Sequence, residues 1–209
     1  MDDIQAKIAT ATMPPEYDTF VSFEPFSPII AEHINEAKNR NAKNAIFESV
    51  MTDSRAELLS ETNGHKTMLF PGSKGPKTAT WEQTKKMADE LNNVGIDVTF
   101  LPEFEDKPST DSLIKIGEKY KLADFKYCTT IKANTIVKEL ERGFRQAGTI
   151  VLKLENMNSG EFKNAIEYIL RNETPYGDIV LINEYGKVLT ITYKEIKSGK
   201  YARKTKGFL

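Results

Sequence analysis

Asp111, Asp124 and Lys126 are the residues whose types and spacing best suit chemistry. Asp124 and Lys126 lie two residues apart within residues 120–127, which the sequence predicts to form a strand. Their side chains therefore leave the same face of the sheet. Asp111 begins the preceding predicted strand, and if the two strands pair antiparallel through a turn near Gly117, Asp111 lies roughly opposite Asp124. The pattern predicts two carboxylates and one lysine at one place.

Two carboxylates brought close together repel each other unless a cation lies between them. Mg²⁺ or Mn²⁺ suits such a site, because Mg²⁺ takes one or two carboxylates and fills its other positions with water and substrate phosphate. A metal-bound water is a better nucleophile, and the metal offsets the charge that develops on a phosphodiester. Lys126 would position this water or stabilise the developing charge. With Asp111 and Asp124 as metal ligands, the residues predict metal-dependent phosphodiester hydrolysis.

Each of the three residues also has a structural explanation. Asp111 suits the entry to a strand, and Lys126 suits a strand edge from which its amine reaches water. Asp124 is harder to explain in this way, because aspartate is disfavoured inside strands.

Helical and strand patterns alternate from Thr80 onward. Thr80 and Gln83 predict a capping box at the start of a helix that ends at Gly95. The predicted strands cover residues 96–102, 112–116, 120–127 and 149–154, and a further helix covers residues 135–147. A helix from about Asn158 and a hairpin around residues 184–186 follow. This order predicts an α/β fold with a mixed β-sheet flanked by helices, ending in a helix plus a β-hairpin.

The first 65 residues have too few large apolar side chains to build a core of their own. Ser27 and Pro28 predict the start of a polar helix that runs to about Val50. A further short helix is predicted to carry Leu58 and Leu59. We expect residues 1–65 to form a helical N-terminal extension and residues 66–209 to form the α/β domain, with its core at 80–155.

Composition limits the classes of function. Lys and Arg total 29 and Asp and Glu total 30, which excludes a bulk electrostatic nucleic-acid binder but not a local basic patch. Cys128 is the single cysteine, so no internal disulfide forms, and with no histidine near it we expect a small buried thiol. No apolar run approaches the roughly 20 residues of a membrane span, and the first residues lack the apolar core of a signal peptide. We therefore expect a cytoplasmic location and no membrane partner.

Residues 194–206 contain six basic residues and one acidic residue, Glu195. Such a segment is commonly a solvated or frayed terminus. Tyr201 and Phe208 among the basic residues also fit phosphate contact combined with base stacking, so both interpretations stay open.

The chemistry-bearing residues resemble a known family. Thr110-Asp111, a gap of twelve residues and then Asp124-Phe125-Lys126 resemble the PD-(D/E)xK nuclease motif, within the order helix, three strands, helix, strand of that superfamily. Residues from about 80 to 155 are more closely similar to tRNA-cleaving toxin domains at the C-termini of CdiA-type contact-dependent inhibition proteins, and to related phage and mobile-element domains. The proline of the motif is displaced, because it stands at Pro108 and not beside Asp111.

The resemblance implies a restriction-endonuclease-like core and an endonuclease that cleaves nucleic acid, with RNA, in particular tRNA, favoured over DNA. It makes Asp111 and Asp124 catalytic or metal-binding carboxylates and Lys126 the catalytic lysine. Glu82 would be the additional acid on the first helix, although a glutamate in a first helical turn is also favoured by the helix dipole. The implied partners are nucleic acid and an immunity protein or a phage structural protein.

Three further residues are candidates for supporting the site or binding substrate. Gln146 matches a glutamine of the family's second helix. Thr130 and Lys132 follow the lysine into the next helix and suit phosphate contacts, although a solvated turn explains them equally well.

The alternative function is a non-catalytic phage or mobile-element assembly or binding module that retains a nuclease-like fold. The N-terminal extension would then dock to the partner, and the near-neutral charge and the displaced proline favour this interpretation. A weaker alternative is a ribonuclease that needs no metal.

Overall fold

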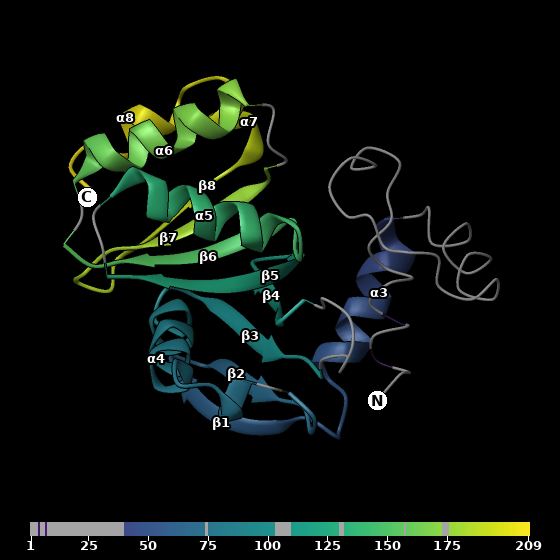
Figure 1. The fold of residues 1–209 in the computed structure, drawn as a ribbon. Helices are drawn as coiled ribbons and strands as arrows, with labels where there is room; N and C mark the ends of the chain where they lie inside the picture. The colour runs from purple at the N-terminus through teal and green to yellow at the C-terminus, as the bar shows by residue number, and fades with distance from the viewer. Residues whose placement is uncertain are drawn as a thin grey trace.

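An eight-stranded β-sheet forms the centre of the structure, a computed structural model that describes residues 4, 7, 40–73, 75–102, 110–129, 132–156, 158–172 and 176–209 (Figure 1). The strands are β1 (Glu57–Thr62), β2 (His65–Leu69), β3 (Ile96–Phe100), β4 (Ser112–Ile116), β5 (Lys119–Cys128), β6 (Thr149–Leu154), β7 (Asp178–Ile182) and β8 (Val188–Ile191). They lie side by side in chain order. The pairs β2–β3, β5–β6 and β6–β7 are parallel and the other four are antiparallel, which confirms the predicted mixed sheet.

Helices connect the parallel strands, because a tight turn can join only antiparallel ones. α4 (Trp81–Asn92) joins β2 to β3, α5 (Ala133–Phe144) joins β5 to β6, and α6 (Ser159–Arg171) joins β6 to β7. α4 lies on one face of the sheet, and α5 and α6 lie on the other (Figure 1). The remaining elements are α3 (Arg40–Met51), the short 3-10 helix η2 (Gly75–Lys77), α7 (Tyr193–Lys197) and α8 (Tyr201–Thr205). Across these described ranges, no helix has both the length and the apolar content needed to cross a membrane.

The sheet is buried on both faces where β6 runs. Val151 faces α4, where it packs in one cluster with Met87 and Phe125. Ile150 and Leu152 face the other way and pack in a second cluster with residues of α5 and α6. All six residues of β6 are buried, which explains why apolar side chains lie on both faces of this strand instead of alternating with exposed polar ones.

α3 covers part of the face that α5 and α6 also cover. Its Phe47 and Val50 are buried against Leu101 and Leu113, with Leu122 of β5 at the margin of the same cluster. The described part of the N-terminal segment thus contributes apolar side chains to the sheet's own core.

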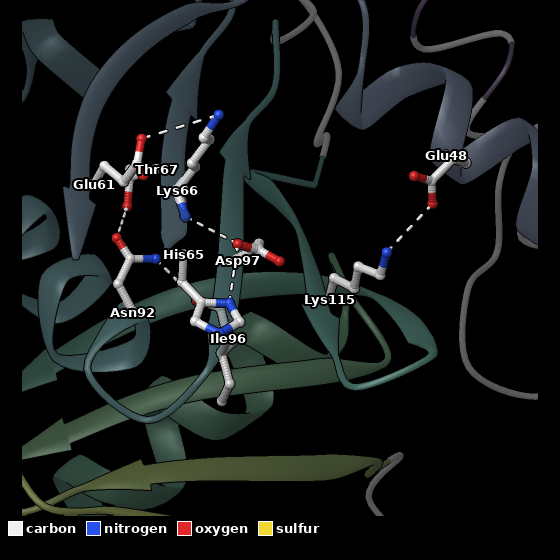
Figure 2. A network of polar contacts seen from close by, with 9 residues as sticks. All are labelled: Glu48, Glu61, His65, Lys66, Thr67, Asn92, Ile96, Asp97 and Lys115. Atoms are coloured by element: carbon white, nitrogen blue, oxygen red, sulfur yellow. Dashed lines mark hydrogen bonds and ion pairs between the residues drawn. The ribbon is translucent and has the colours of Figure 1, made fainter. Parts of the chain in front are cut away.

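Polar contacts cross the sheet beside α3 (Figure 2). Lys115 of β4 forms an ion pair with Glu48 of α3 at 3.5 Å. Asp97 of β3 accepts a hydrogen bond of 2.9 Å from the main-chain nitrogen of Lys66, and its carboxylate lies 3.2 Å from Nδ1 of His65. These contacts join β2 to β3 and β4 to α3, at the partly exposed edge of the cluster that contains Phe47 and Val50.

The segment around Leu58 and Leu59 differs from its prediction. The short helix predicted there is wrong, because both residues belong to β1, which pairs antiparallel with β2 and so joins the sheet. The predicted boundary after residue 65 falls next to the turn of this hairpin. The earlier helix is described from Arg40 to Met51, and its predicted start at Ser27 lies outside the described residues.

Helix α4 begins where the sequence predicts but not by the predicted contacts. Thr80 makes no side-chain capping hydrogen bond, so the capping box with Gln83 is wrong. The main-chain carbonyl of Thr80 instead accepts a hydrogen bond of 3.0 Å from the hydroxyl of Thr84.

Candidate active site

Asp124 and Lys126 form a buried ion pair on β5. The Asp124 side chain is fully buried, and its Oδ2 lies 2.6 Å from Nζ of Lys126, whose side chain is 15% exposed. Apart from this ion pair, neither carboxylate oxygen of Asp124 accepts a hydrogen bond from the residues that the structure describes. The cost of taking such a pair out of water can exceed the gain from its attraction, so stabilisation of the fold alone does not explain the arrangement.

Asp111 lies next to Asp124 in the sheet register. β4 and β5 pair with Ser112 opposite Ala123, and one further step along the register sets Asp111 opposite Asp124. Asp111 continues the ladder to β3, since its carbonyl accepts a hydrogen bond of 2.9 Å from the nitrogen of Leu101. The antiparallel pairing predicted through the turn at Gly117 therefore exists.

The C-terminal half of α5 closes over the ion pair. A Cβ atom on Gly143 would lie 2.8 Å from Oδ2 of Asp124 and 2.3 Å from Cδ1 of Ile150, so only glycine permits this approach. One turn later the carbonyl of Gln146 accepts a hydrogen bond of 2.8 Å from the hydroxyl of Thr110, the neighbour of Asp111. Gln146 thus reaches the site through its main chain.

The charged residues occupy a gap between two apolar clusters on one face of the sheet. On one side Leu122, two residues before Asp124, packs in the cluster of α3. On the other side Ile150, the partner of Asp124 in the β5–β6 register, packs in the cluster of α5 and α6. Asp124 and Lys126 are therefore buried by both clusters without belonging to either.

Glu82 is not brought to this group. It lies on α4, on the opposite face of the sheet, where its side chain is 78% exposed and pairs with Lys85 at 2.8 Å. It lines a shallow pocket of about 370 Å³ between α4 and β1 together with Ser60 and Asp89. The structure therefore places Glu82 in the role of an ordinary first-turn glutamate.

The structure says little about the two remaining substrate-binding candidates, Lys132 and Thr130. Lys132 is the N-cap residue of α5 and is exposed. Thr130 lies outside the described residues.

A second buried acid–lysine pair lies on the α4 face. Lys153 of β6, 2% exposed, forms an ion pair with Glu90 of α4. Beside it, a hydrogen bond to Glu155 together with burial raises the pKa of Tyr127 to about 12. Gly186 lets the β7–β8 turn approach Glu90, because a Cβ there would lie 3.1 Å from Oε1. This pair attaches α4 to the sheet and is separated from Asp124 by the sheet itself.

Cys128 is a buried thiol, as its surroundings in the sequence indicate. Burial, followed by the charge of Glu139, raises its pKa to about 11, so only about one thiol in a thousand is ionised at pH 8. We expect an aromatic disulfide reagent to label the unfolded protein at pH 8 at least about 100-fold faster than the folded protein. Rapid labelling of the folded protein would contradict the burial of Cys128.

The basic C-terminal segment is folded and not frayed. Thr192 and Glu195 form a capping box that starts α7, and the Thr-x-x-Glu spacing in the sequence could have revealed it. Ile196 and Tyr201 are buried in the cluster of α5 and α6. Base stacking by Tyr201, one of the two interpretations of this segment, is therefore wrong.

The site residues fit a divalent cation. Mg²⁺ needs one or two protein carboxylates and completes its shell with water and substrate oxygens. Oδ1 of Asp124 has no hydrogen-bond partner among the described residues, Oδ2 contacts only Lys126 in the ion pair, and Asp111 supplies a second carboxylate in register. Within the described ranges, no group of three or more His, Cys, Asp and Glu side chains gathers at one place.

Comparisons with known proteins give one similarity. No protein-family model matches the chain, and no curated protein matches it. Among solved structures, the chain is similar to the CdiA-CT/CdiI toxin and immunity complex from Burkholderia pseudomallei. The identity is 22%, the match covers 56% of this chain and 87% of that chain, and the TM-score is 0.42. The function is therefore argued below from the residues and their geometry.

Proposed function

We propose that this chain is a metal-dependent phosphodiesterase that cleaves nucleic acid. The observation that carries the proposal is the state of Asp124, which is fully buried, accepts no hydrogen bond within the described residues and pairs with Lys126 at 2.6 Å. A buried acid–lysine pair with a second carboxylate next to it in the sheet register is an arrangement typical of a functional site. The resemblance of the motif favours RNA, in particular tRNA, as the substrate, and an immunity protein as a partner.

Asp111 and Asp124 would hold the cation, and when bound it would lower the pKa of a water and offset the charge that develops on the phosphate. Lys126 is suited to the reacting side of the site, because its side chain is partly exposed while its amine contacts Asp124. From that position it would donate a hydrogen bond to the attacking water or to a phosphate oxygen. Gly143 keeps helix α5 close to the carboxylate and so fixes its rotamer.

Metal binding tests this proposal without requiring a known substrate. A site with a dissociation constant of about 1 mM would be stabilised by about 1.4 kcal/mol in 10 mM metal, since the gain is RT ln(1 + [L]/Kd). For a chain of this size that corresponds to a rise in melting temperature of about 3–5 °C. We expect this rise in MgCl₂ or MnCl₂ for the wild-type protein and its loss in the Asp111→Ala variant.

Glu82→Ala is the matched control, because Glu82 is an acidic residue on the opposite face of the sheet. It should keep the metal-dependent shift. A shift of equal size in the Asp111→Ala variant would place the metal elsewhere, and no shift in any protein would remove the metal from the proposal.

A further inference from the structure

Helices α7 and α8 present a cluster of unpaired positive charges. Five exposed basic side chains, called the α7–α8 basic surface below, form no ion pair with any residue that the structure describes: Lys194, Lys197, Lys200, Arg203 and Lys206. The one acid of the segment, Glu195, is occupied, since Lys204 pairs with it at 2.6 Å. Hydrogen bonds from Lys204 and from the main chain of Thr192 lower the pKa of Glu195 to about 2, so it stays ionised and bound to Lys204 at neutral pH.

Two cations of the neighbouring helix α6 are paired instead. On α6, Lys163 and Arg171 both pair with Glu167, at 3.6 and 3.1 Å, as is usual for a solvated helix face. The chain as a whole has a formal charge of −1, and residues 194–206 hold six basic residues and one acidic residue. The segment thus has a net charge of +5 (6 − 1) and the rest of the chain a net charge of −6 (23 − 29), and a local excess of this kind favours a polyanionic partner.

The α7–α8 basic surface is rigidly attached to the domain. Ile196, Tyr201 and Thr205 are 1–3% exposed and anchor both helices. The amide of Asn183 donates a hydrogen bond of 2.9 Å to the carbonyl of Phe208, which fixes the last residues of the chain. Because Ile196 and Tyr201 share a cluster with α5, the basic surface lies over the same face of the sheet as Asp124.

We infer that the α7–α8 basic surface binds the phosphate backbone of a single-stranded nucleic acid outside the cleavage site. The inference rests on the proposed function for the identity of the polyanion. Phosphates are favoured over a lipid surface, because the exposed large apolar side chains of the described residues lie at Leu58, Leu59, Val94, Tyr168 and Tyr185, and none lies on α7 or α8. An amphipathic membrane-binding helix carries such side chains next to its lysines.

The test measures binding and not cleavage, so that the two proposals can fail separately. A labelled single-stranded RNA of about 20 nucleotides is titrated at several salt concentrations with protein carrying Asp124→Asn, which is expected to leave the probe intact, as a gel would check. One protein additionally carries Lys197→Gln, Lys200→Gln and Arg203→Gln. Each phosphate contact contributes about −0.7 to the slope of log K against log salt for single strands, so losing three contacts should reduce the slope by about 2.

The matched control carries Lys66→Gln, Lys163→Gln and Arg171→Gln, which remove the same net charge from positions that pair with acids. We expect the control to keep the slope and to bind within about twofold of its parent, while the surface variant binds at least about tenfold more weakly at low salt.

Equal loss in both variants, an unchanged slope in the surface variant, or no binding of RNA by the parent would overturn the inference. The same proteins are also titrated with vesicles containing anionic lipid. Loss of vesicle binding in the surface variant, with its RNA binding intact, would overturn the inference as well. A reduced slope in the surface variant, together with a wild-type protein that cleaves no substrate, would support the inference and reject the nuclease.

Discussion

Replacing Asp124 with Asn is expected to lower cleavage of nucleic acid by at least about 100-fold, the scale on which acid–base and metal-binding groups act. Asn keeps the size of the side chain and removes its charge, so it binds a divalent cation more weakly and cannot form the ion pair that orients Lys126. The rate of cleavage of a labelled RNA, measured under single-turnover conditions, checks this prediction.

The same substitution should leave the melting temperature unchanged or raise it. Asp124 holds a charge at a fully buried position where its oxygens accept no hydrogen bond within the described residues, and burying a charge destabilises the folded state. Lys126 is 15% exposed and so retains access to water when its partner becomes neutral.

Asp97→Asn is the control for this experiment. Asp97 is an aspartate of β3 that already has polar neighbours, His65 and the main chain of Lys66, and it should be dispensable for cleavage. Normal cutting by the Asp124→Asn protein, or a large fall in its melting temperature together with retained activity, would make the ion pair structural and remove the site.

Replacing Gly143 with Ala should destabilise the protein, although alanine is usually the better residue inside a helix. The new Cβ would lie 2.3 Å from Cδ1 of Ile150 and 2.8 Å from Oδ2 of Asp124, and both side chains are fully buried, so neither can turn into solvent. Overpacking of this kind costs about 1–3 kcal/mol, and the gain in helix propensity returns about 1 kcal/mol. Because two contacts of the new Cβ lie below 3.0 Å, we expect the upper part of that cost, a net loss of about 1–2 kcal/mol, and so a fall in melting temperature of about 2–8 °C, measured by thermal denaturation.

Cleavage by the folded Gly143→Ala protein should also fall, because the displaced atom is the carboxylate oxygen that contacts Lys126. Gly148→Ala is the matched control: it lies four residues beyond α5, its backbone is not left-handed, and a Cβ there meets nothing within 4 Å. If Gly143→Ala instead stabilises the protein, as replacing a glycine inside a helix ordinarily does, then α5 does not press on Asp124.

The pairing of the site's carboxylates could be predicted from the sequence, but their enclosure could not. The turn at Gly117 fixes the β4–β5 register, and the register alone sets Asp111 opposite Asp124. The contact of α5 with Asp124 depends on how the helix crosses the sheet, which spacing does not encode. Its signal was Gly143 itself, since a glycine inside an apolar helical pattern often marks a close approach.

Predictions from local sequence patterns were wrong where the same pattern fits more than one local structure. Leu58 and Leu59 fit a short helix as well as a strand, and they form strand β1 because this segment pairs with β2. Glu82 is of a residue type expected for a catalytic acid, but it lies on α4, on the opposite face of the sheet from Asp124. The burial of Tyr201 reflects packing of the C-terminal helices on α5 and α6, which the many lysines around it concealed.

Cleavage by the purified protein tests the central claim most directly. Labelled total tRNA, single-stranded RNA and duplex DNA are each incubated with the wild-type protein and the Lys126→Ala variant in Mg²⁺, in Mn²⁺ or in EDTA. We predict cutting of RNA, strongest for tRNA, that requires metal and is lost in the variant. Cutting in EDTA that is lost in the variant would keep the site and remove the metal. A folded wild-type protein that cuts none of the three substrates under any condition would contradict the assignment of Asp111, Asp124 and Lys126 as a nuclease site.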